Sequence, residues 1–336
     1  MCSSVASPDV LTIDAILQPR FLAFGVLMAS AAYVHFRGNV RHPFGRQLTD
    51  HSTFLAPFNV LIYLFSRVPA RAFFEPRDFP ELDWLTANWQ TIREEGMPLL
   101  KGGLVRTATG YNDLGFNSFF RTGWKRFYLK WYDEAVPSAE QLCPNTVALL
   151  RATPSVHGAM FALLPPGARL VRHRDPFAGS LRYHLGLCTP NSDDCFIEVD
   201  GERRAWRDGE AMVFDETFIH YAENKTDITR LILFCDVERP LRGRIPTAIN
   251  RFVINHVLKV TATQNRPGEP IGIANRLFAG VYQIRLLGKR IKRWNRKVYY
   301  IGKYALVACI TAWLLICASR QRSWRPLLSI QRERAE

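Results

Sequence analysis

The chain has 336 residues, 48% of them hydrophobic, which excludes a disordered protein and suits one large domain or two modest ones. Its seven cysteines are scattered without a Cys-x-x-Cys pair. This pattern excludes a disulfide framework and a cysteine-based zinc site, and it is typical of a reducing compartment.

The formal net charge is +14. Residues 241–336 contain 19 of the 44 basic residues and 3 of the 30 acidic residues. The first 240 residues then contain 25 basic and 27 acidic residues, so the positive charge lies in the C-terminal segment. A basic segment of this kind binds nucleic acid or an anionic membrane.

Two apolar runs favour the membrane. "FLAFGVLMASAAYVHF" (21–36) and "YALVACITAWLLICAS" (304–319) each have 16 residues between basic flanks, slightly short of the roughly 20 that span a bilayer. We expect terminal membrane helices. Buried helices are the alternative for both runs, a cleaved signal peptide for the first, and an interfacial or re-entrant helix for the second. Because basic clusters flank the region between the runs, we expect that region in the cytoplasm, and we expect the basic segment to meet anionic phospholipid rather than nucleic acid.

The predicted elements change character along the chain. Residues 51–157 are expected to be mainly helical; within them the apolar "LAPFNVLIYLF" (55–65) either lies on the membrane surface or packs in the core. From 158 to 240, short apolar runs alternate with turn residues, including a hairpin signal at Asp200-Gly201. About eight such strands predict an antiparallel sandwich or jelly roll. The expected division is a membrane anchor with a basic flank (1–50), a helical region (51–157), a β core (158–240) and a basic C-terminal segment (241–336) that holds the second apolar run.

Charged residues interrupt the predicted strands. His173 and Asp175 are two positions apart, so on a strand they share one face. His220 opens a later strand. Two imidazoles and one carboxylate on one side of a metal form the facial triad of non-haem Fe(II) oxygenases. A structural polar network and a zinc hydrolase site are the alternatives that we weigh against it.

Arg230 stands ten residues after His220 at the start of the apolar run "RLILFCDVE". A guanidinium is costly in such a strand unless an anion pairs with it, and its planar fork suits a carboxylate. An octahedral iron with three protein ligands has three open positions, two for a chelating 2-oxoacid and one for O2. Arg230 then holds the far carboxylate of 2-oxoglutarate and argues against zinc hydrolysis. Arg182 and His184 share a face of another apolar strand.

At these residues the chain resembles the aspartyl/asparaginyl β-hydroxylase superfamily and, within it, the lipid A 2-hydroxylases of Gram-negative bacteria. The resemblance is carried by "SVHGAMFALLPPGARLVRHRDPFAGSLRYHLGL", "CFIEVDGERRAWRDGEAMVFDETFIHYAEN" and "RLILFCDVERPLRGR". It implies an α+β protein with a double-stranded β-helix (jelly-roll, cupin-like) core that uses Fe(II), 2-oxoglutarate and O2. By the family pattern, the residues and their roles are His173, Asp175 and His220 as metal ligands, Arg230 and His184 at the cosubstrate, and Arg182 at the substrate.

The resemblance also implies the reaction and its place. We expect hydroxylation of a lipid A acyl chain at carbon 2, with succinate and CO2 as coproducts, at the cytoplasmic face of the bacterial inner membrane. The partners are then lipid A and anionic phospholipid; we expect no nucleic acid, and the sequence indicates no protein partner. Two alternatives stay open: hydroxylation of Asp or Asn side chains in a peptide, and a non-catalytic jelly-roll module that binds a phosphoglycolipid.

Overall fold

The computed structural model describes residues 19–47, 49–107, 113, 115–132 and 136–323. The beginning of the predicted N-terminal anchor (1–18) and the end of the basic C-terminal segment (324–336) therefore lie outside the described residues. The chain divides into two compact units, one formed by 30–281 and the other by 1–29 with 282–336. Every strand named below belongs to the first unit.

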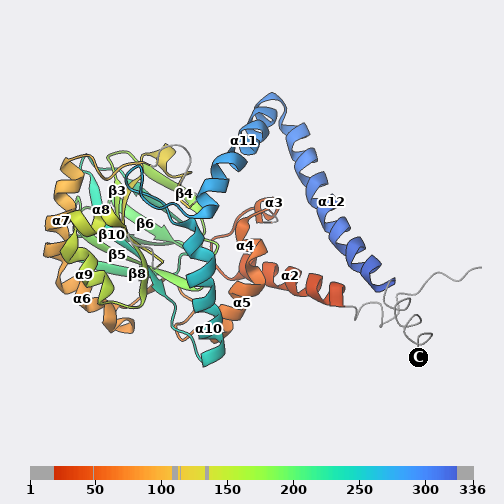
Figure 1. Ribbon diagram of the computed structural model, residues 1–336, viewed down its shortest axis with the longest axis horizontal. Helices are drawn as coiled ribbons and strands as arrows, with labels where there is room; N and C mark the ends of the chain where they lie inside the picture. Colours follow the sequence, from red (N-terminus) through yellow and green to blue (C-terminus); the bar gives the residue numbers. More distant parts are fainter. Residues whose placement is uncertain (1–18, 48, 108–112, 114, 133–135, 324–336) are drawn as a thin grey trace, which may run out of the picture. The chain divides into compact units, whose positions relative to one another are not determined.

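The first unit begins within the first described helix and ends within the penultimate one (Figure 1). The α-helices are α2 (Pro19–Phe36), α3 (Phe44–Gln47), α4 (His51–Phe54), α5 (Ala56–Phe65), α6 (Asp83–Ala87), α7 (Trp89–Lys101), α8 (Pro137–Leu142), α9 (Pro144–Arg151), α10 (Arg244–Phe252), α11 (Ile273–Trp294) and α12 (Arg296–Ser323). The strands are β1 (Phe73–Phe74), β2 (Lys125–Trp131), β3 (Val156–Leu164), β4 (Arg169–His173), β5 (Ser180–Cys188), β6 (Cys195–Val199), β7 (Glu202–Ala205), β8 (Ala211–Phe214), β9 (His220–Asn224) and β10 (Arg230–Glu238).

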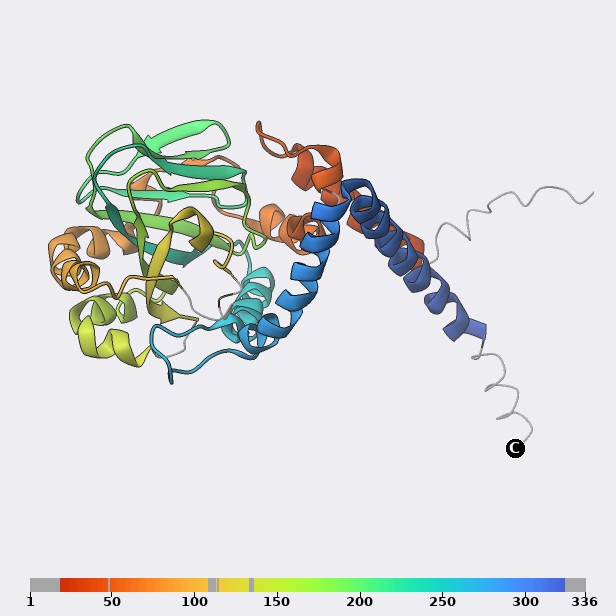
Figure 2. The ribbon, with the colours of Figure 1, turned by 90° about the horizontal axis from the view of Figure 1, so that it is seen from above.

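The strands form two antiparallel sheets (Figure 2). Their strand orders are β1-β8-β5-β10-β3-β2 and β4-β9-β6-β7. From β3 to β10 the chain passes repeatedly from one sheet to the other. This winding is that of the double-stranded β-helix, or jelly roll. The predicted β core is confirmed, and β1 and β2 extend its larger sheet at the two edges.

The predicted hairpin at Asp200-Gly201 is also confirmed. It joins β6 to β7, with Val199 opposite Glu202. Asp200 and Gly201 have φ angles of 51° and 92°. Two successive positive φ values define the primed turn that suits the twist of a two-residue hairpin, and glycine adopts the second without steric cost.

Both faces of the larger sheet are buried, but against different partners. On the outer face, a Cβ built on Gly96 of α7 would meet Phe161 of β3 and Leu231 of β10 at 3.2 to 3.4 Å, and the Tyr183 hydroxyl lies 2.9 Å from that of Thr86 in α6. Helices α6–α9 therefore cover this face (Figures 1 and 2). Because side chains alternate along a strand, the inner face receives the other set: Arg182, His184, Arg230, Phe234 and Asp236, all buried.

Helix α5 answers the question that its sequence left open. It buries Ala56, Asn59 and Ile62 against the protein, while Leu64 stays 73% exposed. The segment 55–65 thus packs in the core along one face and presents apolar side chains to the surroundings at its end.

The membrane-spanning helices predicted at 21–36 and 304–319 need correction. Among the described residues, no helix combines the length and the apolarity needed to cross a bilayer. A helical run of 16 residues is about 24 Å long at 1.5 Å per residue, against roughly 30 Å of hydrocarbon.

A buried ion cluster ties the end of α2 to the barrel. Asp215, which follows β8, pairs with Arg37 at 2.5 Å and with Arg239 at 2.9 Å, and its side chain is fully buried. Burial alone would raise the pKa of this carboxyl, but the two guanidinium groups outweigh burial and hold it below its usual range.

We predict that Asp215→Asn lowers the free energy of unfolding by about 3–5 kcal/mol, because it leaves two buried guanidinium groups without a counter-charge. Urea unfolding measures the change. Asp193→Asn is the matched control, since Asp193 pairs with Arg207 but its side chain is 90% exposed; its loss should cost about 1 kcal/mol or less. Equal effects for the two variants would contradict the prediction.

Candidate metal centre

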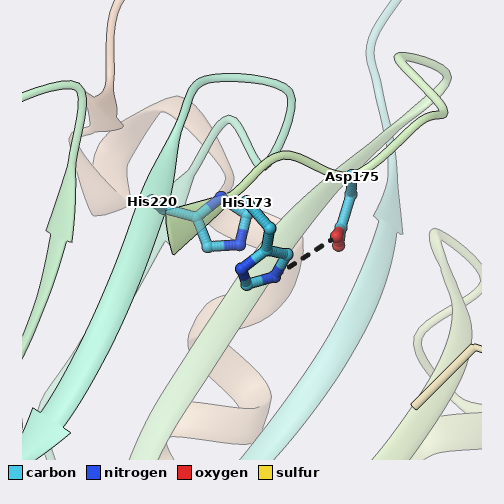
Figure 3. Close-up of side chains that lie close together, drawn as sticks. All are labelled: His173, Asp175 and His220. Atoms are coloured by element: carbon cyan, nitrogen blue, oxygen red, sulfur yellow. Dashed lines mark ion pairs between the residues drawn. The ribbon is translucent and has the colours of Figure 1, made fainter. Parts of the chain in front are cut away.

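His173 and His220 are cross-strand partners. His173 ends β4 and His220 begins β9, directly opposite each other in the ladder. Their ring centroids lie 4.2 Å apart. Asp175 follows two residues after β4, and its Oδ1 lies 3.6 Å from His173 Nε2. One ligand atom from each of the three residues lies within 4.8 Å of the others, an arrangement that could hold one metal ion (Figure 3).

Hydrogen bonds to the backbone orient both imidazoles. His173 Nδ1 lies 2.7 Å from the Val171 carbonyl oxygen, and His220 Nδ1 lies 2.9 Å from that of Phe218. A carbonyl only accepts, so each Nδ1 carries the proton and each Nε2 keeps its lone pair. Metal-binding histidines are typically held in this way. Burial lowers the pKa of both rings, that of His220 to about 3. Both are therefore neutral at physiological pH, as ligation requires.

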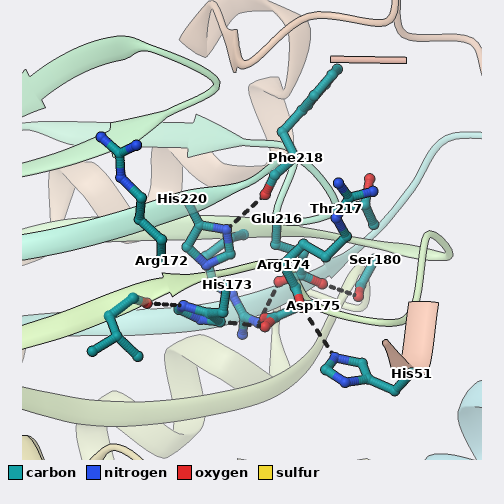
Figure 4. A network of polar contacts seen from close by, with 12 residues as sticks. His51, Arg172, His173, Arg174, Asp175, Ser180, Glu216, Thr217, Phe218 and His220 are labelled. Atoms are coloured by element: carbon teal, nitrogen blue, oxygen red, sulfur yellow. Dashed lines mark hydrogen bonds and ion pairs between the residues drawn. The ribbon is translucent and has the colours of Figure 1, made fainter. Parts of the chain in front are cut away.

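Asp175 is placed by its backbone and by an arginine. Its N–H donates to the Glu216 carbonyl oxygen at 2.9 Å, and both residues are labelled in Figure 4. Its Oδ2 accepts from Arg182 at 2.6 Å. Burial alone would raise the pKa of this carboxyl, but the adjacent Arg182 guanidinium favours the ionised form and the pKa is lowered. The sequence predicted that His173 and Asp175 share one face of a strand. In the structure β4 ends at His173, and Asp175 lies in the loop that follows, where it still approaches His173.

Arg182 lies deeper than its predicted contact with substrate requires. Its guanidinium pairs with Asp175, Glu216 and Asp236, and it lies 4.0 Å from the ring centroid of Phe234. Burial alone would lower its pKa, but the carboxylates outweigh burial and raise it. With its donors taken by three carboxylates, Arg182 is placed as a positioning residue for Asp175. The structure offers no support for its predicted role at the substrate.

Arg230 and His184 lie in a second polar group on the inner face. Nε and Nη1 of Arg230 are buried without a hydrogen-bond partner among the described residues. Burial lowers the pKa of Arg230 to about 10, so it remains charged at neutral pH. Its guanidinium lies 4.2 Å from the ring centroid of Trp206, whose Nε1 donates to His184 Nδ1 at 3.3 Å. An indole N–H only donates, so the His184 proton is on Nε2, which is also buried without a partner there. Two buried donors thus await an acceptor.

Three residues of this interior were missing from the predicted site. Asp236, like Arg230, is a charged residue within the apolar run "RLILFCDVE", so the same argument could have identified it. Glu216 follows Asp215 before a strand, where an acid pair usually indicates a solvated turn. Burial raises the pKa of Glu216 well above its usual range, and that of Asp236 as well. For Trp206, no local pattern in the sequence indicates its contact with His184.

The part of the chain that carries these residues matches a known family model. Residues 86–240 match the model described as Aspartyl/Asparaginyl beta-hydroxylase, and all six predicted site residues fall within that range. The match spans 155 of the 336 residues, so this segment is similar to the aspartyl/asparaginyl β-hydroxylase family. The predicted resemblance to this superfamily is therefore confirmed, whereas that to its lipid A 2-hydroxylase branch is not.

Individual relatives cover about half of the chain. The ornithine lipid ester-linked acyl 2-hydroxylase of Rhizobium tropici is 33% identical over 174 residues, which are 49% of this chain and 62% of that protein. The aspartyl/asparaginyl beta-hydroxylase of Mus musculus is 28% identical over 190 residues, 53% of this chain and 25% of that protein. A prolyl-4-hydroxylase structure from Pseudomonas putida is 19% identical, covers 47% of this chain and 88% of that one, and has a TM-score of 0.31, too low to support a conclusion.

We predict that His173→Ala, Asp175→Ala and His220→Ala each weaken metal binding more than about 100-fold, because removing a ligand costs more than the 10- to 100-fold typical of an outer partner. Anaerobic calorimetry with Fe(II) measures the change. His157→Ala is the control, because His157 Nε2 pairs with Glu238 at 3.3 Å instead. An unchanged dissociation constant in any of the three variants would remove that residue from the metal site.

Arg182→Lys tests the positioning role. Lysine keeps the positive charge but has no planar fork to bridge three carboxylates. The orientation of Asp175 should loosen, and Fe(II) affinity should fall about 10- to 100-fold. Circular dichroism verifies that the variant is folded. A folded variant with wild-type affinity would show that Arg182 does not position the ligand.

Proposed function

We propose that this protein is an Fe(II)- and 2-oxoglutarate-dependent dioxygenase that hydroxylates the acyl chain of a membrane lipid at carbon 2. One observation carries the proposal: a two-histidine, one-aspartate cluster lies inside the same barrel as two buried donors that have no partner in the part of the chain that the structure describes. The cluster suits Fe(II). The donors, Arg230 and His184 Nε2, suit the anionic oxygens of a dicarboxylate. A zinc hydrolase has no use for the second group.

The residues would divide the work as follows. His173, Asp175 and His220 would hold the iron, and Arg182 would keep the Asp175 carboxylate turned toward it. Arg230 would pair with the far carboxylate of 2-oxoglutarate, and His184 would donate a hydrogen bond to the same molecule. When bound, the iron and cosubstrate supply the oxidising chemistry: O2 gives one oxygen atom to the substrate C–H bond and one to succinate, and CO2 is released. The protein supplies position and a dry interior.

The lipid substrate is supported by two likenesses. The motifs resemble those of lipid A 2-hydroxylases, and one relative is named as an acyl 2-hydroxylase of an ornithine lipid. We therefore propose lipid A as the substrate and place the reaction at the cytoplasmic face of the inner membrane. Free thiols at Cys143, Cys188, Cys195, Cys235 and Cys309 are compatible with that reducing compartment.

Mass spectrometry of the lipids tests the substrate. Cells with and without the protein are compared for a gain of one oxygen atom at carbon 2 in lipid A, in ornithine lipid and in phospholipid. Lipid A alone should change, and the His220→Ala variant should abolish the change. Oxidation of ornithine lipid alone would move the substrate to that class. Purified protein that oxidises an Asp- or Asn-containing peptide but no lipid would favour the peptide hydroxylase.

Arg230→Lys tests the cosubstrate. It keeps the charge but loses the paired donors, so 2-oxoglutarate should bind more weakly; Arg230→Ala should weaken it about tenfold to 100-fold or more, since a charge-assisted pair contributes roughly 1.5–3 kcal/mol. Calorimetry with Fe(II)-loaded protein under anaerobic conditions gives the dissociation constant. Arg207→Lys is the control, because Arg207 pairs with the exposed Asp193. Equal affinity in the wild type and Arg230→Ala would place the cosubstrate elsewhere.

A further inference from the structure

Helix α10 presents three different faces. Pro246 and Asn250 are buried, and Asn250 Nδ2 donates to the Gly179 carbonyl oxygen at 2.9 Å. Ile245, Ile249 and Phe252 are 74%, 39% and 60% exposed. At about 100° per residue these three positions form one continuous stripe on the helix, separate from the buried face. The helix therefore packs through a proline and an asparagine and leaves its large apolar side chains outside.

The third face of α10 lines a basic groove. A surface cavity of about 470 Å³ lies between this helix and the segment after α5. Arg67, Arg244 and Arg251 line it, with Thr247. Arg251 pairs with Glu238 at 2.9 Å. Among the described residues, the guanidinium groups of Arg67 and Arg244 pair with no carboxylate. The groove therefore carries a surplus of positive charge beside the apolar stripe.

The end of α5 is joined to the start of α10. The Arg242 N–H donates to the Phe65 carbonyl oxygen at 2.7 Å, and the Arg67 N–H donates to that of Pro240 at 2.8 Å. Leu64 and Phe65 stand at this junction, and both are exposed. Figure 1 shows the two helices next to each other. We call the exposed part of this region the α5–α10 surface; it consists of Leu64, Phe65, Arg67, Arg244, Ile245, Ile249, Arg251 and Phe252.

We propose that the α5–α10 surface docks on an anionic lipid bilayer. Its apolar side chains enter the boundary between headgroups and acyl chains, and its arginines meet lipid phosphates. An apolar helix stripe beside unpaired basic residues is the pattern of interfacial helices. A second copy of the chain fits less well, because a two-fold contact places each basic groove near its own symmetry mate. The proposal extends the proposed function by naming the surface that meets the lipid phase.

A local probe tests docking in the full chain. An environment-sensitive fluorescent amino acid is placed at position 252 and, as a control, at position 228, where Ile228 is also exposed but on the turn before β10. With vesicles of phosphatidylcholine and phosphatidylglycerol, emission from position 252 should shift to the blue and be quenched by brominated lipid, while position 228 should not respond. Protein that sediments with the vesicles while position 252 does not respond would overturn the proposal.

Variants separate the two components of the surface. Ile245→Glu with Ile249→Glu should abolish the response at position 252, whereas Ile228→Glu should not. Arg67→Glu with Arg244→Glu should weaken anchoring of position 252 on anionic vesicles by about tenfold or more and leave neutral vesicles unaffected. Unchanged binding in the folded variants, or a concentration-dependent dimer that Ile249→Glu dissolves without any vesicle effect, would contradict the proposal. All binding is measured without iron or 2-oxoglutarate, so failure of the proposed hydroxylation leaves this result separate.

Discussion

The interior of the barrel depends on one guanidinium. Arg182 on β5 holds carboxylates from three places: the loop after β4, the loop before β9, and β10. It thereby links both sheets at the point where the candidate metal ligands meet. In a low-dielectric interior, removing Arg182 leaves the acids around it without a positive partner. An apolar replacement of the whole group would pack as well, but Asp175 would then lose its anchor. The network is therefore better explained by the site than by stability.

The same interior explains why this sheet tolerates so many charges. The outer face of the larger sheet is covered by helices and is apolar, as for Tyr183 and Leu231. The inner face sorts its polar residues into two groups. One surrounds Arg182 and is rich in acids. The other surrounds Arg230, which pairs with no acid among the residues that the structure describes. Their difference in charge balance suits one group to a cation and the other to an anion.

Much of this was predictable from the sequence, for identifiable reasons. Turn-bounded apolar runs predict the jelly roll, because a strand needs only local alternation. Arg230 and the histidines were found because ionisable groups are anomalous in apolar strands. The partners of Arg182 could not be found in this way. They depend on β5 pairing with β10 and on the loop at Glu216 lying beneath it, and no local pattern encodes either. An arginine predicted to face substrate thus has three internal partners instead.

Helix α10 does not bury the apolar side of its amphipathic pattern. An amphipathic helix is expected to bury its apolar stripe, yet α10 packs through Pro246 and Asn250 and exposes Ile245 and Phe252. Helix α10 is therefore an exception to that general rule. The two apolar runs were interpreted from hydropathy and basic flanks, and neither shows whether the apolar part of a helix is long enough to cross a bilayer.

The position of β4 at the edge of its sheet affects the local stability of the barrel. β4 is an edge strand, paired on one side only, by β9. Its ladder is interrupted by a bulge between Leu170 and His173, so few backbone bonds hold it. The two histidines face each other across this interrupted edge pairing. An ion bound between them would cross-link this edge strand to its neighbour. Loss of the ion would then allow β4 to separate from β9 more often, and proteases would cleave the metal-free protein at this edge more readily than the metal-bound protein.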